Sequence, residues 1–214
     1  MDLSLYLPRL GDGLVLSLQL TAISVVLGYA LGLVFALGVS STNKLVRFPT
    51  LVVVEIGRGI PALVVLYIVY YGFPAIGILF ENVLAAAIGL TFTAAAYSSE
   101  MIRAGLQSVP KGQLEAAAAL GLHGRTAFGR VIFPQGIRSA IPGLMGLAIQ
   151  SFQGTSLAYS ISVNELMSQS YQVSTITFDY LAVYAITGLM YVAIAVPATW
   201  LSMGVEKRLA RGYA

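Results

Sequence analysis

Cysteine is absent from the 214 residues, charged side chains are scarce, and histidine occurs once. Without cysteine the chain forms no disulfide and no thiolate metal site. The single histidine, His123, cannot by itself supply a metal cluster or a proton relay. Charged residues make up only 10% of the chain, against about 25% in an ordinary soluble domain, and are too few to cover a water-facing surface. These shortages exclude a soluble globular fold and favour a membrane protein.

Apolar residues make up 57% of the sequence. A bilayer core of about 30 Å needs about 20 apolar helical residues, and a helix satisfies its own backbone groups in lipid. The sequence therefore predicts an all-α membrane protein with five transmembrane helices in one domain, residues 1–214. The 13–43 run is too long for a signal peptide, so no removable targeting segment is expected. The predicted spans are approximately residues 14–40, 59–80, 82–103, 136–160 and 180–205.

Basic residues indicate which connections face the cytoplasm. They follow span one, fill the segment between spans three and four, and end the chain, whereas the connections around Glu81 and from Glu165 to Asp179 contain none. The N-terminus is expected outside and the C-terminus in the cytoplasm. The net charge of +3 is therefore assigned to topology and contact with membrane lipid, not to nucleic acid.

Several polar residues lie within the predicted third and fourth spans. Such groups either join helices or line a path for a small polar solute, and the sequence leaves both readings open. No carboxylate or histidine is expected deep in a span, as a coupling proton would require. The candidate substrate-path residues are Tyr97, Gln150, Gln153, Thr155 and Ser156.

Two charged pairs and one glycine pair indicate helix contacts. Glu100 and Arg103 are one turn apart and are expected to pair in a structural role, as are Glu55 and Arg58. Gly28 and Gly32 form a small-xxx-small pattern, which suits close approach of two membrane helices.

The longest polar segment, residues 108–134, predicts a short helix lying across the cytoplasmic face. Pro110 and Gly112 are expected to break the preceding helix, and residues 113–120 are strong helix formers with Glu115 in the first turn. Gly121 fits a C-terminal cap. The exposed alanines would fit either the groove of a partner protein or the lipid headgroup region, and physical reasoning favours neither interpretation.

The same segment resembles the EAA loop of ABC importer permeases. The family pattern is Glu-Ala-Ala, three residues, Gly, nine residues, Ile-x-Leu-Pro, and here Glu115, Ala116, Ala117, Gly121 and the stretch 131–134 stand at those distances. Stretches 55–61, 96–103, 108–113 and 155–157 are similar to motifs of polar amino acid permeases. The resemblance covers roughly residues 11–166.

That resemblance implies a type I, MetI-like importer fold in a bacterial inner membrane. The implied partners are a cytoplasmic ABC ATPase dimer, an identical or homologous second permease subunit and an external solute-binding protein. The solute would be an amino acid or a related small polar molecule. The implied ATPase-coupling residues are Gln113, Glu115, Ala116, Ala117 and Gly121.

The chain itself is not expected to be an enzyme. It contains no Gly-x-x-x-x-Gly-Lys motif followed by Ser or Thr, so ATP and Mg²⁺ are expected on the partner ATPase, with no cofactor or metal on this chain. One departure puts the exact solute in doubt: the subfamily usually has Lys two residues before Thr-Ser-Leu, where this chain has Gln153 and Gly154. The alternatives are a permease for an opine or osmolyte, an autonomous ion- or proton-coupled transporter, and a non-transporting scaffold.

Overall fold

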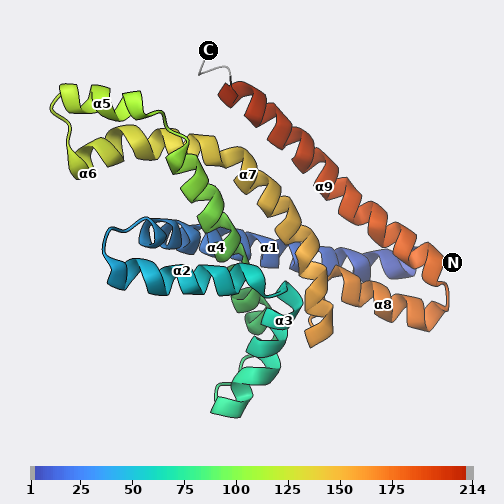
Figure 1. The fold of residues 1–214 in the computed structure, drawn as a ribbon. Coiled ribbons are helices and arrows are strands. Elements are labelled where there is room, and N and C mark those ends of the chain that lie inside the picture. The colour runs from blue at the N-terminus through green and yellow to red at the C-terminus, as the bar shows by residue number, and fades with distance from the viewer. Residues whose placement is uncertain (1–2, 211–214) are drawn as a thin grey trace.

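A computed structural model describes residues 3–210, and every regular element within that range is helical (Figure 1). The predicted all-α fold is thus confirmed. The long helices are α1 (Leu3–Val39), α2 (Lys44–Gly59), α4 (Asn82–Gln107), α7 (Phe133–Gly154) and α9 (Tyr180–Ala210). The shorter helices are α3 (Ala62–Tyr67), α5 (Lys111–Ala119), α6 (Gly124–Ala127) and α8 (Leu166–Thr177).

Three of the described helices are long and apolar enough to cross a membrane, and a fourth crossing is formed if the bent pair α2 and α3 counts as one span. The three are α1, α4 and α9, which match the first, third and fifth predicted spans. The fourth predicted span corresponds to α7 followed by the 3₁₀ helix η4 (Thr155–Ile161). The helix α7 does not meet the same criterion, so the count of five crossings stays a prediction.

The second span differs from the prediction, which began it at residue 59 and left residues 44–58 as a connection. Those residues form α2 instead, and the chain then bends by 106° before α3. The bend lies at Ile60 and Pro61, where the proline cannot continue the helix. Sequence reading missed α2 because its charged residues interrupt the apolar run, although Val54 and Gly57 are buried.

Wide helical turns precede two prolines. The π-helix η1 (Ile68–Gly72) leads into Pro74 of the 3₁₀ helix η2 (Phe73–Ile76), and the π-helix η3 (Phe128–Ile132) leads into Pro134 of α7. A proline lacks the backbone N–H and its ring crowds the carbonyl four residues earlier. A wider turn relieves that crowding while the chain stays helical.

The helices α1 and α4 pack closely through small residues. A Cβ on Gly28 would lie 2.7 Å from Ala94 Cβ, and one on Gly32 would lie 2.9 Å from the Ala95 carbonyl oxygen. The Ser98 hydroxyl donates to the Gly28 carbonyl oxygen at 3.3 Å. The small-xxx-small prediction of a close helix contact is therefore confirmed.

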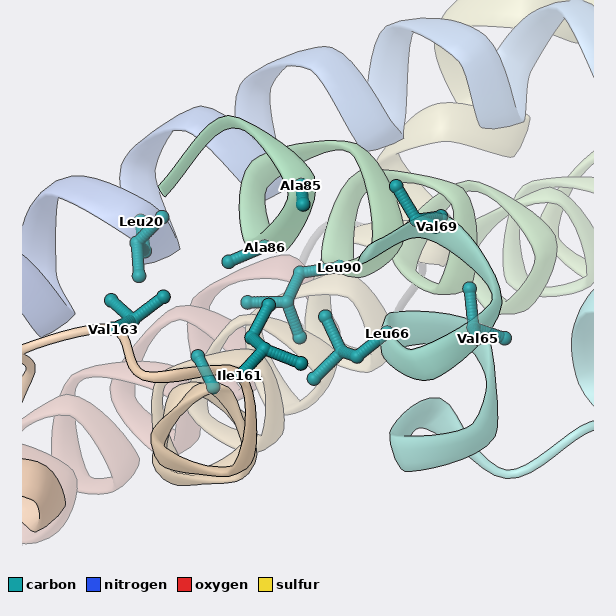
Figure 2. Packing of buried hydrophobic residues seen from close by; sticks show 10 residues of the cluster. Leu20, Val65, Leu66, Val69, Ala85, Ala86, Leu90, Ile161 and Val163 are labelled. Carbon is teal, nitrogen blue, oxygen red and sulfur yellow. The ribbon is translucent and has the colours of Figure 1, made fainter. Parts of the chain in front are cut away.

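One hydrophobic cluster joins α1, α3, α4 and η4 (Figure 2). Leu20 of α1, Leu66 of α3 and Ile161 of η4 are fully buried in it, together with Ala85, Ala86 and Leu90 of α4. The helix α4 is thus central, and it connects the cluster at its first half to α5 beyond its last residue (Figure 1).

The predicted outer connection 165–179 is also largely helical, because α8 occupies residues 166–177. The Ser170 side chain is fully buried, and its hydroxyl lies 2.6 Å from that of Thr187 on α9. The helix α8 therefore packs on α9 instead of extending into solvent, and its exposed side includes Tyr171 and Gln172.

Candidate functional site

The loop 108–134 contains the short predicted helix, observed as α5. Lys111 begins this helix after Pro110, so Gly112 lies inside it and Glu115 is its fifth residue. The predictions that Gly112 breaks the preceding helix and that Glu115 lies in the first turn are therefore wrong. Proline fits the position before the first helical residue because its fixed φ suits a helix start and no N–H is needed there, which moves the start two residues earlier.

The predicted cap at Gly121 is confirmed as a Schellman motif. Gly121 has φ +78°, its N–H donates to the Ala118 carbonyl at 3.0 Å, and the Leu122 N–H donates to the Ala117 carbonyl at 2.9 Å. A residue with a Cβ is strained at this φ, so glycine ends α5 at lowest cost.

The candidate coupling residues are distributed over both sides of α5. Gln113, Glu115, Ala116 and Gly121 are exposed, whereas Ala117 is only 3% exposed and packs inward. Two leucine side chains are also exposed, Leu114 by 50% and Leu120 by 80%. α5 therefore presents small and apolar side chains outward, which is suited to contact with another surface.

Two side-chain hydrogen bonds connect the first part of this loop to α7. The Gln135 amide donates to the Gln113 side-chain oxygen at 3.3 Å, and the Ser108 hydroxyl donates to that of Ser139 at 2.9 Å. Next to these bonds α4 and α7 touch through glycine: a Cβ on Gly105 would lie 2.4 Å from the Gly136 carbonyl oxygen. A displacement of α5 would therefore be transmitted to α4 and α7.

A cleft of about 230 Å³ lies between α3, α4 and α7, and it contains two of the five predicted path residues, Tyr97 and Gln150. The Gln150 side chain is exposed, and within residues 3–210 its amide has no hydrogen-bond partner. The Tyr97 hydroxyl donates to the Arg58 carbonyl at 3.1 Å. The cleft is lined by Ala62, Leu90, Thr93, Ala94, Tyr97, Leu147, Gln150, Ser151 and Gly154.

The other three path residues lie beyond the cleft lining. Gln153 is exposed and Ser156 is partly buried, with its hydroxyl donating to the Gln153 carbonyl at 2.8 Å. Thr155 is fully buried, and its hydroxyl donates to the Phe152 carbonyl at 2.7 Å. The Thr155 side chain therefore faces the protein interior, where its hydroxyl is bonded to the end of α7.

Four charged side chains form a chain of ion pairs between α2 and α4. Arg58 pairs with Glu55 at 3.3 Å, and Arg103 contacts Glu100 through two hydrogen bonds. Both pairs were predicted from their spacing. The sequence did not reveal that Arg58 also reaches Glu100 at 3.9 Å across the two helices, since nothing in the local spacing relates residues 58 and 100.

One buried carboxylate was missed. Glu165 is fully buried and caps α8, where it accepts hydrogen bonds from the Met167 and Ser168 N–H groups at 2.9 and 2.8 Å. The Ser17 hydroxyl of α1 donates to it at 3.3 Å and the Tyr191 hydroxyl of α9 at 3.4 Å. Burial raises the pKa of the Glu165 carboxyl to about 7. An acidic residue at the start of a helical stretch was the signal that could have revealed this cap.

Known proteins similar to the chain match it over most of its length. Relatives from Bacillus subtilis (strain 168) include a probable amino-acid ABC transporter permease, 37% identical over 95% of this chain and 90% of the relative, and an L-cystine transport system permease, 35% identical over 95% and 88%. A crystal structure of an amino acid ABC transporter with histidines superposes with a TM-score of 0.92 at 30% identity, covering 97% of each chain.

A methionine ABC transporter in an inward-facing conformation shares the fold alone, with a TM-score of 0.75 at 20% identity over 96% of this chain and 99% of that one. The family described as binding-protein-dependent transport system inner membrane component matches residues 28–211. The resemblance carried by the EAA loop is thus confirmed. The chain belongs to this family, the permease subunits of ABC importers, and is a transport subunit of the inner membrane, not an enzyme.

Proposed function

We propose that this permease moves an amino acid or a related small polar solute into the cytoplasm. The relatives support this solute class, since those of Bacillus subtilis include an arginine permease at 30% identity and a probable glutamine permease at 32%. A nopaline permease at 32% identity keeps an opine as the second candidate. We assign the first selection among these solutes to the external binding protein.

The cleft at Tyr97 and Gln150 is assigned to the solute path. Its polar lining is uncharged, since it consists of threonine, tyrosine, glutamine and serine side chains. Thr93 and Ser151 donate to carbonyls of their own helices, which leaves the Gln150 amide for a ligand. Within the described chain no carboxylate lines this cleft, so a zwitterionic or neutral solute suits it better than a strongly cationic one. A second permease subunit, identical or homologous, would close the open side.

We assign the energy supply for transport to a cytoplasmic ATPase dimer, which would hold ATP and Mg²⁺ and dock on residues 112–124. The observation that carries this assignment is the outward face of α5, with its small and apolar side chains above the close contact of α4 and α7. Docked there, an ATPase that moves α5 would move both membrane helices. The N-terminus is placed outside and the C-terminus in the cytoplasm.

The experiment uses Ala116→Glu, which adds bulk and charge to an exposed position of α5. Burying an unpaired charge in a docked interface costs several kcal/mol, so ATPase co-purification should fall by more than tenfold while membrane insertion is kept. Thr42→Glu, in the exposed turn between α1 and α2, is the matched control and should bind the ATPase normally. Equal co-purification of both variants would remove α5 from the docking surface.

A further inference from the structure

The basic end of α2 carries a hollow that the transport path does not use. Lys44, Arg47, Phe48 and Leu51 line this hollow, which has a volume of about 380 Å³. A second hollow, of about 220 Å³, lies between α1, α2 and α4 and shares Arg47 and Leu51 with the first. Arg47 therefore lines two adjacent hollows, and their shared wall is called the junction below.

The charge at this junction is uncompensated. Lys44 and Arg47 are exposed, and among residues 3–210 neither has an ion-pair partner. The carboxylates that line the second hollow are Glu55 and Glu100, and both are already held by arginines, at positions 58 and 103. Among the described residues, no carboxylate lines the first hollow. An anion entering it therefore meets two free cations.

The surroundings of these cations are apolar. Leu45 is 85% exposed and Phe48 67% exposed, on the same first turns of α2 as Lys44 and Arg47. The helix follows directly on the apolar span α1 through a short turn, which places its start at the membrane surface. Free cations beside exposed apolar side chains at that depth match the two parts of a phospholipid, an anionic head and an acyl chain.

We propose that Lys44 and Arg47 bind the phosphate group of an anionic phospholipid in the cytoplasmic leaflet, with an acyl chain along Phe48 and Leu51. The leaflet rests on the proposed orientation, which places the start of α2 at the cytoplasmic surface. The chemistry itself, a phosphate ester held by a guanidinium and an ammonium group, is shared with free phosphate. The apolar half of the hollow favours the lipid.

The test measures lipid bound to the purified transporter complex by native mass spectrometry, with phosphatidylglycerol as the probe. Arg47→Gln and Lys44→Gln should each weaken phosphatidylglycerol binding about fivefold, equal to about 1 kcal/mol. Arg47→Lys keeps the positive charge and should retain most of the wild-type binding. Lys207→Gln removes an exposed cation near the end of α9 and is the matched control, which should bind as the wild type does. Because lipid binding needs no transport, the result is independent of solute and ATPase activity.

Three outcomes would overturn the proposal. Inorganic phosphate that displaces phosphatidylglycerol at equal concentration would make the site one for free phosphate. Equal binding of phosphatidylcholine would show that the cations do not select the anionic head. Unchanged phosphatidylglycerol binding in Arg47→Gln, together with loss of the ATPase from the complex, would make this surface a protein contact instead.

Discussion

Alanine at Gly105 or Gly136 is expected to separate α4 from α7 at the base of the loop 108–134. A Cβ on Gly105 would lie 2.4 Å from the Gly136 carbonyl oxygen, and one on Gly136 would lie 2.7 Å from the Leu106 Cα. Both obstacles are backbone atoms, so no side-chain rotation relieves them. An ordinary contact begins at 3.4 Å, so the helices have to separate by about 1 Å.

The energetic balance favours destabilisation. Overpacking of this kind costs typically about 1–3 kcal/mol, while alanine contributes up to about 1 kcal/mol of helix propensity over glycine. The net loss, up to about 2 kcal/mol, lowers the Tm by up to roughly 8 °C for a domain of this size. The separation also breaks the Ser108 to Ser139 hydrogen bond, which lies beside it, and loosens the attachment of α5.

Thermal unfolding of the solubilised complex and the ATP hydrolysed per solute transported in proteoliposomes are the two readouts. The control is Gly129→Ala in η3, where an added Cβ meets nothing within 4 Å, and it should leave both unchanged. We expect Gly105→Ala to lower the Tm and to raise the ATP consumed per solute. A Gly105→Ala complex that matched Gly129→Ala in both readouts would refute the close-contact reasoning.

Three further predictions concern the buried Glu165, the ion pairs of Glu55 and Glu100, and the membrane orientation. Because the folded-state pKa of Glu165 is raised from 4.5 to about 7, the unfolded chain loses its proton first as the pH rises. The free energy of unfolding should therefore fall by about 3 kcal/mol between about pH 4.5 and pH 7 and stay level above that, a slope in Tm that Glu165→Gln should remove. Glu100→Gln should lower the Tm more than Glu55→Gln, since Glu100 contacts two arginines and Glu55 one, with about 1 kcal/mol or less for each exposed pair. An impermeant thiol reagent added outside cells should label Gln172→Cys and not Thr126→Cys, both exposed positions, and the reverse labelling would invert the proposed orientation.

Local sequence rules predicted what local chemistry determines. The cap at Gly121 and the pairs Glu100 with Arg103 and Glu55 with Arg58 depend on residues within one or two turns, and all are present. The glycine pattern at 28 and 32 predicted a close helix contact, although the partner, α4, could not be named from it. The charge pattern was informative about membrane residence and misleading about α2, whose charged residues are carried on a helix.

Long-range contacts lay beyond the sequence. Glu165 accepts hydrogen bonds from Ser17 and Tyr191, residues 148 and 26 positions away, and only the packing of α1, α8 and α9 brings them together. Thr155 and Gln150 are similar polar residues of one span, yet one is fully buried and the other faces the cleft. The helix α7 ends at Gly154, between these two residues, and Thr155 begins η4, so one helical period does not relate their sides.

Solute uptake into proteoliposomes is the most direct test of the central claim, that this permease imports a small polar solute with energy from a separate ATPase. The vesicles would contain the chain with its cognate ATPase and second subunit, with the binding protein and radiolabelled amino acid on the outer-face side and ATP on the other. We predict accumulation that requires ATP, the ATPase and the binding protein together, and that is lost in Ala116→Glu. Accumulation by the chain alone, driven by a proton or sodium gradient without ATP, would contradict the account.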